Sequence, residues 1–273
     1  YFTAHGDAFR TFLSSYIEQD AVALWQPRLV RIDSEGSTSA HWRAPRYVGV
    51  PAMNSLCKEM ANGMSVQRGV RAIGLERVES RWRIDLDNGE STAEYDWVLS
   101  TAPSVQTAAL MPELAKDTAA GWDDVVMKGC FSLMMGFTTS LDLPWDAATV
   151  SESPLAWIAV NNTKPGRTNA VSVLCQADND WSDRNMEADL STVQEQLCAA
   201  FERATGVDAS KAAHVALHRG RYAKVLSAAR STHLLSEELR LGAAGDWFGC
   251  GRVEAAFDSA EALASALLVR ISG

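Results

Sequence analysis

A strand, a glycine-bearing loop and a helix follow one another at residues 239–273, and this succession constrains the fold more than any other stretch. Residues 239–244 form a short apolar run that is typical of a strand. Gly245 opens the loop, and apolar residues then recur at helical spacing. Such a unit directs the free N–H groups of a helix N-terminus at one spot, which suits an anion such as a pyrophosphate. The pattern predicts an α/β fold.

The helix in this stretch carries sequence signals for both of its ends. Asp258 lies three residues before Glu261, which is the spacing of a capping box and predicts a helix start near Asp258. Gly273 predicts the end of the helix. Taken alone, the stretch is also typical of an ordinary strand–loop–helix unit of an α/β domain, because glycine loops before helices are common.

Composition excludes several classes of function. The 273 residues, with 47% hydrophobic and 22% charged, are typical of a soluble globular protein of one large domain or two packed subdomains. A net charge of −9 without a basic run argues against nucleic acid and anionic membrane surfaces as partners. No apolar run reaches the roughly 20 residues that a transmembrane helix needs, so no transmembrane segment is predicted.

Cysteine and histidine usage argues against metal chemistry. The five Cys are widely spaced without a C-x-x-C pair, and the five His have no ligand spacing. We therefore expect no metal site and no disulfide framework, and a reducing compartment, such as the cytoplasm or an organelle interior, is favoured. The sequence also has no Gly-x-Ser-x-Gly elbow. No catalytic residue is predicted.

Gly245-Asp246-Trp247, followed by Gly251-Arg252-Val253-Glu254 and an Ala-rich helix, resembles the last motif of FAD-dependent amine oxidases. The likeness is greatest to the renalase-like branch of that family. The resemblance implies that Asp246 binds the ribityl or pyrophosphate part of FAD. It also implies that the helix after it points its N-terminus at the flavin.

Two further stretches resemble the same branch. Residues 1–4, Tyr-Phe-Thr-Ala, are similar to the "YFTAR" segment that follows the first βαβ unit of the family. Residues 46–56, RYVGVPAMNSL, resemble the "vGvPGMsaL" segment, where the chain returns to the cofactor domain. The G-x-G-x-x-G loop of the first unit has no counterpart in the sequence. We therefore expect a sequence that starts after this unit.

Two shorter resemblances complete the implied cofactor site. Val70 begins Val70-Arg71-Ala72-Ile73, which resembles a strand whose Val backbone pairs with the adenine edge. The strand expected over residues 95–101 leads into Ala102-Pro103, which resembles the strand–Ala-x-Pro junction where the family's chain leaves the cofactor domain a second time. The implied FAD-binding residues are Val70, Pro103, Gly245, Asp246, Arg252 and Val253.

The resemblance also implies a domain division. Residues 46–103 and 239–273 would form an incomplete, Rossmann-like FAD-binding part without its first βαβ unit. Residues 1–45 and 104–238 would form an antiparallel-sheet substrate domain. Strands expected at 64–67 and 239–244 would flank the central strand of the absent unit. The backbone there would be unpaired unless the gap is filled, so we expect a further segment, a partner protein that completes the sheet, or a rearranged sheet.

Two functions remain open at this point. The first is a renalase-like oxidoreductase that passes a hydride from an amine or a reduced nicotinamide to FAD, with His41 and Trp42 as candidates for a substrate pocket or for a structural role. The second is a cofactor-free relative that serves as a structural or assembly subunit. Ala255 and Ala260 favour the second, because the family usually has Gly there and a methyl group hinders close approach to a cofactor.

Overall fold

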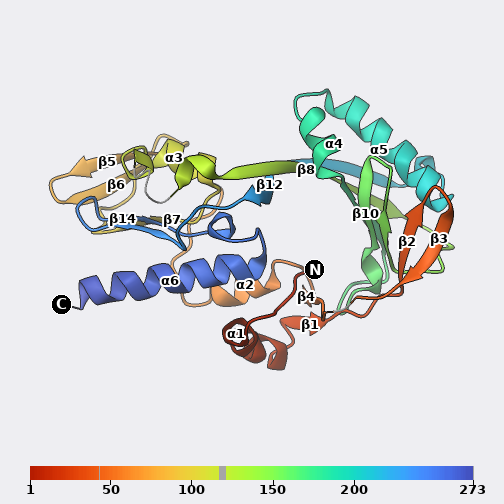
Figure 1. Cartoon of the computed structure of the whole chain (residues 1–273), viewed down its shortest axis with the longest axis horizontal. Coiled ribbons are helices and arrows are strands. Elements are labelled where there is room, and N and C mark those ends of the chain that lie inside the picture. The colour runs from red at the N-terminus through yellow and green to blue at the C-terminus, as the bar shows by residue number, and fades with distance from the viewer. Residues whose placement is uncertain (43, 117–120, 273) are drawn as a thin grey trace. The chain divides into compact units, whose positions relative to one another are not determined.

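The computed structural model describes residues 1–42, 44–116 and 121–272, and the chain divides into two units (Figure 1). Unit 1 comprises Tyr1–Met60 and Lys128–Lys224, and unit 2 comprises Ala61–Met127 and Val225–Gly273. The sheets contain antiparallel and mixed strands accompanied by helices, which confirms the predicted α/β class. The unit boundaries differ from those expected for a cofactor part and a substrate part, and that functional division stays a prediction.

A seven-stranded sheet forms the body of unit 1, in the order β12-β8-β11-β10-β9-β2-β3. From β8 to β3 the neighbours pair antiparallel, except β2 and β9, which pair parallel. The strands are β2 (Leu29–Asp33), β3 (Gly36–Ala40), β8 (Val126–Phe137), β9 (Ala147–Val150), β10 (Leu155–Val160), β11 (Val171–Ala177) and β12 (His214–Ser227).

Helix α5 (Leu190–Thr205) covers one face of this sheet (Figure 1). Asp189 caps it by accepting the N–H groups of Ser191 and Thr192, and Gly206 ends it with a left-handed φ of 72°. Its apolar stripe packs on the alternate residues of β8 that face inward, and each such buried side chain contributes about 1.5–3 kcal/mol. The shared core includes Phe131, Leu133, Met135, Val193, Leu197 and Phe201. The shorter α4 (Asn179–Arg184) precedes it.

The N-terminal part of unit 1 corrects one prediction. A helix over residues 6–26 fits the apolar spacing, but α1 (Asp7–Glu18) ends early. Asp20 has a φ of 56°, so the chain turns there and β1 (Val22–Leu24) pairs antiparallel with β4 (Tyr47–Gly49). Helix α2 (Ser55–Met60) follows β4. Trp25 consequently lies in extended chain beyond β1 instead of in a helix.

Unit 2 contains a three-stranded sheet in the order β13-β14-β7. Strand β14 (Leu241–Ala243) pairs antiparallel with β13 (Leu234–Ser236) and parallel with β7 (Val98–Ser100). The predicted strand at 64–67 is wrong, because these residues are turn and coil. Of the alternatives expected for the gap beside residues 239–244, the structure has the rearranged sheet, because β13 and β7 occupy both sides of β14. Within the described ranges, β7 has β14 as its one sheet neighbour.

Unit 2 also contains a separate two-stranded hairpin, formed by β5 (Ala72–Val78) and β6 (Arg81–Leu86). Helices α3 (Ser104–Leu110) and α6 (Val253–Ile271) follow β7 and β14. The core of the unit lies among Trp82, Met111, Trp122, Leu241, Trp247 and Phe248. These large side chains come from strands, helices and loops alike, so packing rather than extensive strand pairing stabilises the unit.

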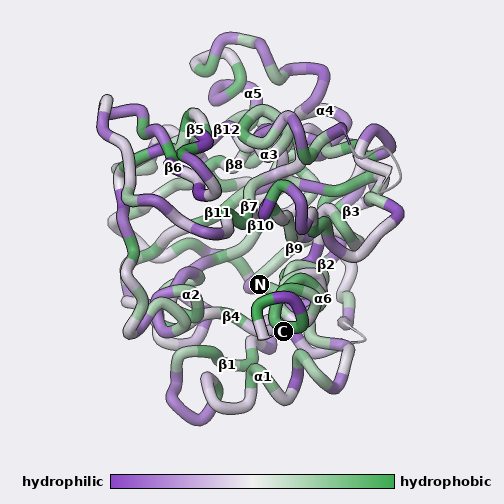
Figure 2. The backbone as a smooth tube through the Cα atoms, turned by 90° about the vertical axis from the view of Figure 1, so that its left-hand side faces the viewer, coloured by the Kyte–Doolittle hydropathy of each residue, from purple (hydrophilic) through white to green (hydrophobic). Residues whose placement is uncertain are grey.

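Helix α6 begins at Val253, ahead of the predicted start at Asp258. Asp258 and Glu261 are both exposed within the helix, because two residues three apart also share a solvent face of a helix. Gly273, the predicted end, lies outside the described residues. Figure 2 shows hydrophobic colouring on much of α6, in keeping with its Ala- and Leu-rich sequence.

Candidate functional site

Strands β7 and β14 run parallel and end side by side within unit 2. Ala243 is in register with Ser100, and the N–H group of Ala244 donates to the Ser100 carbonyl oxygen at 3.0 Å. Pro103 then caps α3, while Gly245 opens the loop to α6. In open α/β sheets, ligands bind beyond the carboxyl ends of the strands. The junction of β7, β14 and α6 is therefore the first candidate site.

Trp247 holds this loop in place. Its side chain is buried, its indole stacks on Phe248 with ring centroids 3.7 Å apart, and its Nε1–H donates to the Ala102 carbonyl oxygen at 3.1 Å. The Gly245 N–H group donates to Ser259 Oγ of α6 at 3.1 Å. These hydrogen bonds connect the loop to α6 and to the segment after β7. Asp246 therefore lies in a loop whose neighbouring residues are fixed by packing and hydrogen bonds.

Asp246 is partly buried, and burial raises the pKa of its carboxyl, while hydrogen bonds from the backbone N–H groups of Asp246 and Trp247 act in the opposite direction. No ion pair to Asp246 is found within the described part of the chain. A carboxylate has two oxygens that accept several donors. Asp246 therefore has acceptor capacity for the hydroxyl groups of a ligand.

The glycines of the loop lie against the chain's own atoms. A Cβ atom at Gly245 would lie 2.7 Å from the indole nitrogen of Trp247, and one at Gly249 would lie 2.8 Å from Cβ of Ala255. Close approach within the protein thus explains these two glycines without a ligand. The residues that fit a nucleotide cofactor are instead the carboxylate of Asp246 and the cationic, exposed N-terminus of α6.

Arg252 and Val253 are exposed at this N-terminus, where Arg252 is the N-cap residue of the 19-residue helix α6 and makes no side-chain cap bond. Together with Pro103, Gly245 and Asp246 they lie around one junction. Val70 does not, because it lies in the segment before β5, and the strand expected to include it begins at Ala72. The binding role of all these residues stays a prediction.

Ala255 and Ala260, the two departures from the family pattern, lie in different surroundings. The Ala255 methyl group packs toward Gly249, whereas Ala260 is exposed on α6. Of these two methyl groups, the one that lies against the loop is that of Ala255.

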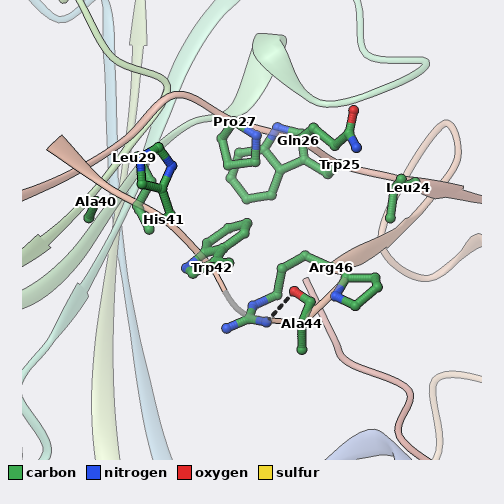
Figure 3. A pocket seen from close by; sticks show the side chains of 11 residues that line it. Leu24, Trp25, Gln26, Pro27, Leu29, Ala40, His41, Trp42, Ala44 and Arg46 are labelled. Carbon is green, nitrogen blue, oxygen red and sulfur yellow. Dashed lines mark hydrogen bonds between the residues drawn. The ribbon is translucent and has the colours of Figure 1, made fainter.

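A second candidate site is a cavity of about 450 Å³ within unit 1 (Figure 3). Two segments form it: the link between β1 and β2, and the link between β3 and β4. Its volume is typical of small-molecule pockets. The lining residues that the argument uses are Trp25, Gln26, Pro27, His41, Trp42 and Arg46.

Two indoles, those of Trp25 and Trp42, form part of the wall of this cavity, and further aromatic rings pack behind Trp42. Trp25 is buried, and its ring centroid lies 5.6 Å from that of Trp42. Trp42 stacks at 5.8 Å on Trp157 of β10, and the Tyr1 ring lies 5.0 Å from Trp42. Ala147 and Ala159 belong to the buried core beneath. Sheet strands that carry small residues there leave room for the indoles.

Two cations accompany these rings. The guanidinium carbon of Arg46 lies 4.5 Å from the ring centroid of Trp42, and its NH1 group donates to the Ala44 carbonyl oxygen at 2.8 Å (Figure 3). Lys164 is 5% exposed, with its Nζ 5.3 Å from the Trp25 centroid and 3.0 Å from Asn161 Oδ1. Burial, and then the charge of Arg167, lowers the pKa of Lys164 to about 8.

Sequence reasoning identified His41 and Trp42 of this cavity. It missed Trp25 and Arg46, which also line the cavity, and Lys164, whose ammonium group lies near the Trp25 ring. The helix expected over residues 6–26 hid Trp25, and Lys164 is far from the other residues in sequence. The density of tryptophan, nine in the chain, was the one available signal.

The described residues contain no group of three or more His, Cys, Asp or Glu side chains that could hold a metal ion. They also include no helix with the length and apolarity needed to cross a membrane.

No family model matches the chain. Solved structures do. One is a protein from Exiguobacterium sp. 255-15, provisionally named a protoporphyrinogen oxidase, which is 13% identical to this chain with a TM-score of 0.60. The match includes 81% of this chain and 52% of the Exiguobacterium chain. Putrescine oxidase bound to putrescine is 12% identical with a TM-score of 0.58 and coverages of 83% and 54%. Cyclohexylamine oxidase from Brevibacterium oxydans IH-35A is 10% identical with a TM-score of 0.58 and coverages of 81% and 53%.

At these identities the likeness shows the fold: the chain has the fold of solved amine oxidases and of the Exiguobacterium protein. The chain spans about half the length of these structures.

Proposed function

We propose that this protein is a flavin-dependent oxidoreductase, in which the junction of β7, β14 and α6 holds FAD. The observation that carries the proposal is Asp246, a partly buried carboxylate at the end of parallel strands and in front of a 19-residue helix. The fold likeness to amine oxidases and the sequence resemblance around Gly245-Asp246-Trp247 support it. The fold likeness favours the superfamily and does not single out the renalase-like branch.

Each residue of the junction would have a defined task. Asp246 would accept hydrogen bonds from hydroxyl groups of the ribityl chain. Arg252 and the N-terminus of α6 would neutralise the pyrophosphate charge. Trp247 would keep the loop in one position through its bond to Ala102. The bound FAD would supply the redox chemistry, by accepting two electrons and a proton from the substrate.

The finer proposal follows the resemblance to the renalase-like branch. It names an amine or a reduced nicotinamide as the hydride donor. The likeness to putrescine oxidase and cyclohexylamine oxidase supports small-molecule oxidation in general. A structural or assembly role without a cofactor is the alternative, and the Ala255 methyl group at the loop is its one structural argument.

The test is the visible spectrum of the purified native protein, followed by FAD titration. Bound oxidised flavin makes the protein yellow. Asp246→Asn should weaken FAD binding by about 1.5–3 kcal/mol, which is roughly 10- to 150-fold in Kd, because a charged acceptor is lost. Asp258→Asn is the matched control, since Asp258 is an exposed carboxylate on helix α6, beyond the loop that carries Asp246.

The outcomes separate the alternatives. A yellow protein whose affinity falls with Asp246→Asn and not with Asp258→Asn supports the proposal. A colourless native protein that takes up no FAD supports the cofactor-free role instead. Flavin binding that is equal in both variants would contradict the assignment of Asp246.

A further inference from the structure

The cavity of unit 1 combines aromatic walls with positive charge. Trp25, Trp42 and Pro27 supply flat apolar surface, and Arg46 supplies a guanidinium (Figure 3). Within the described part of the chain, no Asp or Glu lines the cavity. A local absence of carboxylates is notable in a protein with a net charge of −9.

The guanidinium of Arg46 has hydrogen-bonding capacity to spare. Its NH1 group donates to Ala44, but its Nε is buried without a partner among the residues that the structure describes. No salt bridge to Arg46 is found among these residues either. Buried donors are nearly always satisfied, because leaving one unpaired costs about 1–3 kcal/mol. A carboxylate from a ligand would supply acceptors in the two-pronged geometry that a guanidinium prefers.

Stacking against Trp42 and Tyr1 limits where this guanidinium can move. Its carbon lies 4.5 Å from the Trp42 centroid and 5.1 Å from the Tyr1 centroid. A cation over two aromatic rings is stabilised in place and is less hydrated than a free one. Arg46 thus offers a fixed positive charge beside flat apolar walls.

Lys164 places a second positive charge 5.3 Å from the centroid of the Trp25 ring, although it is not one of the residues that line the cavity. Its Nζ bonds to Asn161, and no carboxylate pairs with it within the described ranges. Arg167 lies close enough to oppose its charge. A protonated amine that entered the cavity would meet Arg46 and Lys164 as like charges, which is unfavourable in a poorly solvated site.

We infer that this cavity binds a planar aromatic carboxylate, with its ring against the indoles and its carboxylate on Arg46. Charge disfavours a cationic amine at Arg46. The cavity is formed by other residues than the proposed flavin site, so this inference does not depend on which hydride donor that site uses, and it is tested without turnover.

The test compares three probes that share one ring: phenylacetate, phenylacetamide and phenethylamine. Calorimetric titration of the full protein, without an electron acceptor, measures each Kd. Phenylacetate should bind at least roughly 10-fold more tightly than phenylacetamide, because the charge-assisted bond is about twice as strong as a neutral one. Phenethylamine should bind most weakly. Equal binding of the amine and the carboxylate, or no binding of any probe, overturns the inference.

Variants identify the residue responsible. Arg46→Gln should remove the preference for phenylacetate over phenylacetamide, and Arg31→Gln, an exposed arginine on β2 outside the cavity, should leave it unchanged. Arg46→Lys keeps the positive charge but loses the paired N–H donors of the guanidinium, so part of the preference for phenylacetate over phenylacetamide should persist. Lys164→Met, which leaves Arg46 in place, should lower the phenylacetate affinity more than the phenylacetamide affinity. A preference that survives both Arg46→Gln and Lys164→Met overturns the inference.

The flavin proposal and this inference can fail separately. Loss of flavin from the Asp246→Asn variant with unchanged phenylacetate binding would leave the inference intact. Phenylacetate binding that follows Asp246 and not Arg46 would place the ligand elsewhere and overturn it.

Discussion

The indole N–H of Trp247 donates to the carbonyl oxygen of Ala102 at 3.1 Å. This bond joins the loop after β14 to the segment after β7, the two places where the candidate cofactor residues gather. Thr107 Oγ1 donates to the same carbonyl at 2.9 Å. The position of Asp246 therefore depends on the side chain of Trp247, its neighbour in sequence.

Trp247→Phe should destabilise unit 2 and weaken FAD binding together. The variant loses the bond to Ala102 and leaves a small void, so the free energy of unfolding should fall by on the order of 2 kcal/mol. Urea unfolding and FAD titration measure the two effects. Trp82→Phe is the control, because the Trp82 indole makes the same kind of bond, to the Leu239 carbonyl at 2.8 Å. Stability should fall in both variants, but FAD affinity should fall only in Trp247→Phe.

Gly249→Ala should destabilise the protein, and Ala255→Gly should relieve much of the effect. The new Cβ atom would lie 2.8 Å from Cβ of Ala255, closer than real Cβ atoms approach. Such overpacking costs about 1–3 kcal/mol. Ala255 lies in the first turn of α6, so the roughly 1 kcal/mol penalty for glycine in a helix interior should be smaller there. Thermal unfolding of both single variants and the double variant gives the coupling; simple additivity would contradict this packing.

Local patterns along the chain anticipated much of the fold. The alternation of Trp82, Ile84 and Leu86 is typical of a half-buried strand, and these residues lie in β6. Asn88-Gly89 is typical of a hairpin turn, and Gly89 has a φ of 84°. The stretch after Asp189 has the apolar spacing of an amphipathic helix, and it forms α5 with Asp189 as its cap. These elements are decided by neighbours in sequence, so periodicity and cap residues suffice to find them.

The misses have a common physical origin in tertiary contacts. The helix expected through Gln26 stops at Glu18, because pairing of β1 with β4 outweighs helical spacing. The stretch expected to form a strand at 64–67, Met-Ser-Val-Gln, pairs with no other strand of the described residues, and a single short stretch without a partner does not form a strand. The cavity was found only in part for the same reason: Arg46 and Lys164 meet the indoles through the fold, not through spacing.

Ala255→Gly together with Ala260→Gly tests whether a methyl group at the loop limits flavin binding. Flavin content of the purified double variant should rise, and Ala255→Gly alone should reproduce the rise, since Ala260 is exposed. Absorbance of flavin relative to protein is the measurement. Unchanged or lower flavin content in both variants would show that Ala255 does not crowd the cofactor.

Lys164 should make stability depend on pH in the alkaline range. Its pKa is about 8 in the folded protein against an ordinary value of 10.5, and burial is the main cause. Below about pH 8 the lysine is charged in both the folded and the unfolded state, and the folded state bears the cost of burying the charge. Between pH 8 and 10.5 the unfolded state binds the extra proton, so the free energy of unfolding should rise with pH. The total rise is on the order of 3 kcal/mol.

Other side chains also titrate between pH 8 and 10.5. The part of the rise in unfolding free energy that comes from Lys164 is therefore obtained by comparing the wild type with a variant that lacks this lysine. Unfolding of Lys164→Met should lack this component, so its stability relative to the wild type should fall as the pH goes from 7 to 10.5. Lys58→Met, which removes an exposed lysine of α2, should keep a constant difference from the wild type. Urea unfolding at a series of pH values gives these differences. A Lys164→Met difference that stays constant, or that moves in the other direction, would mean that burial does not lower the pKa of Lys164 in solution.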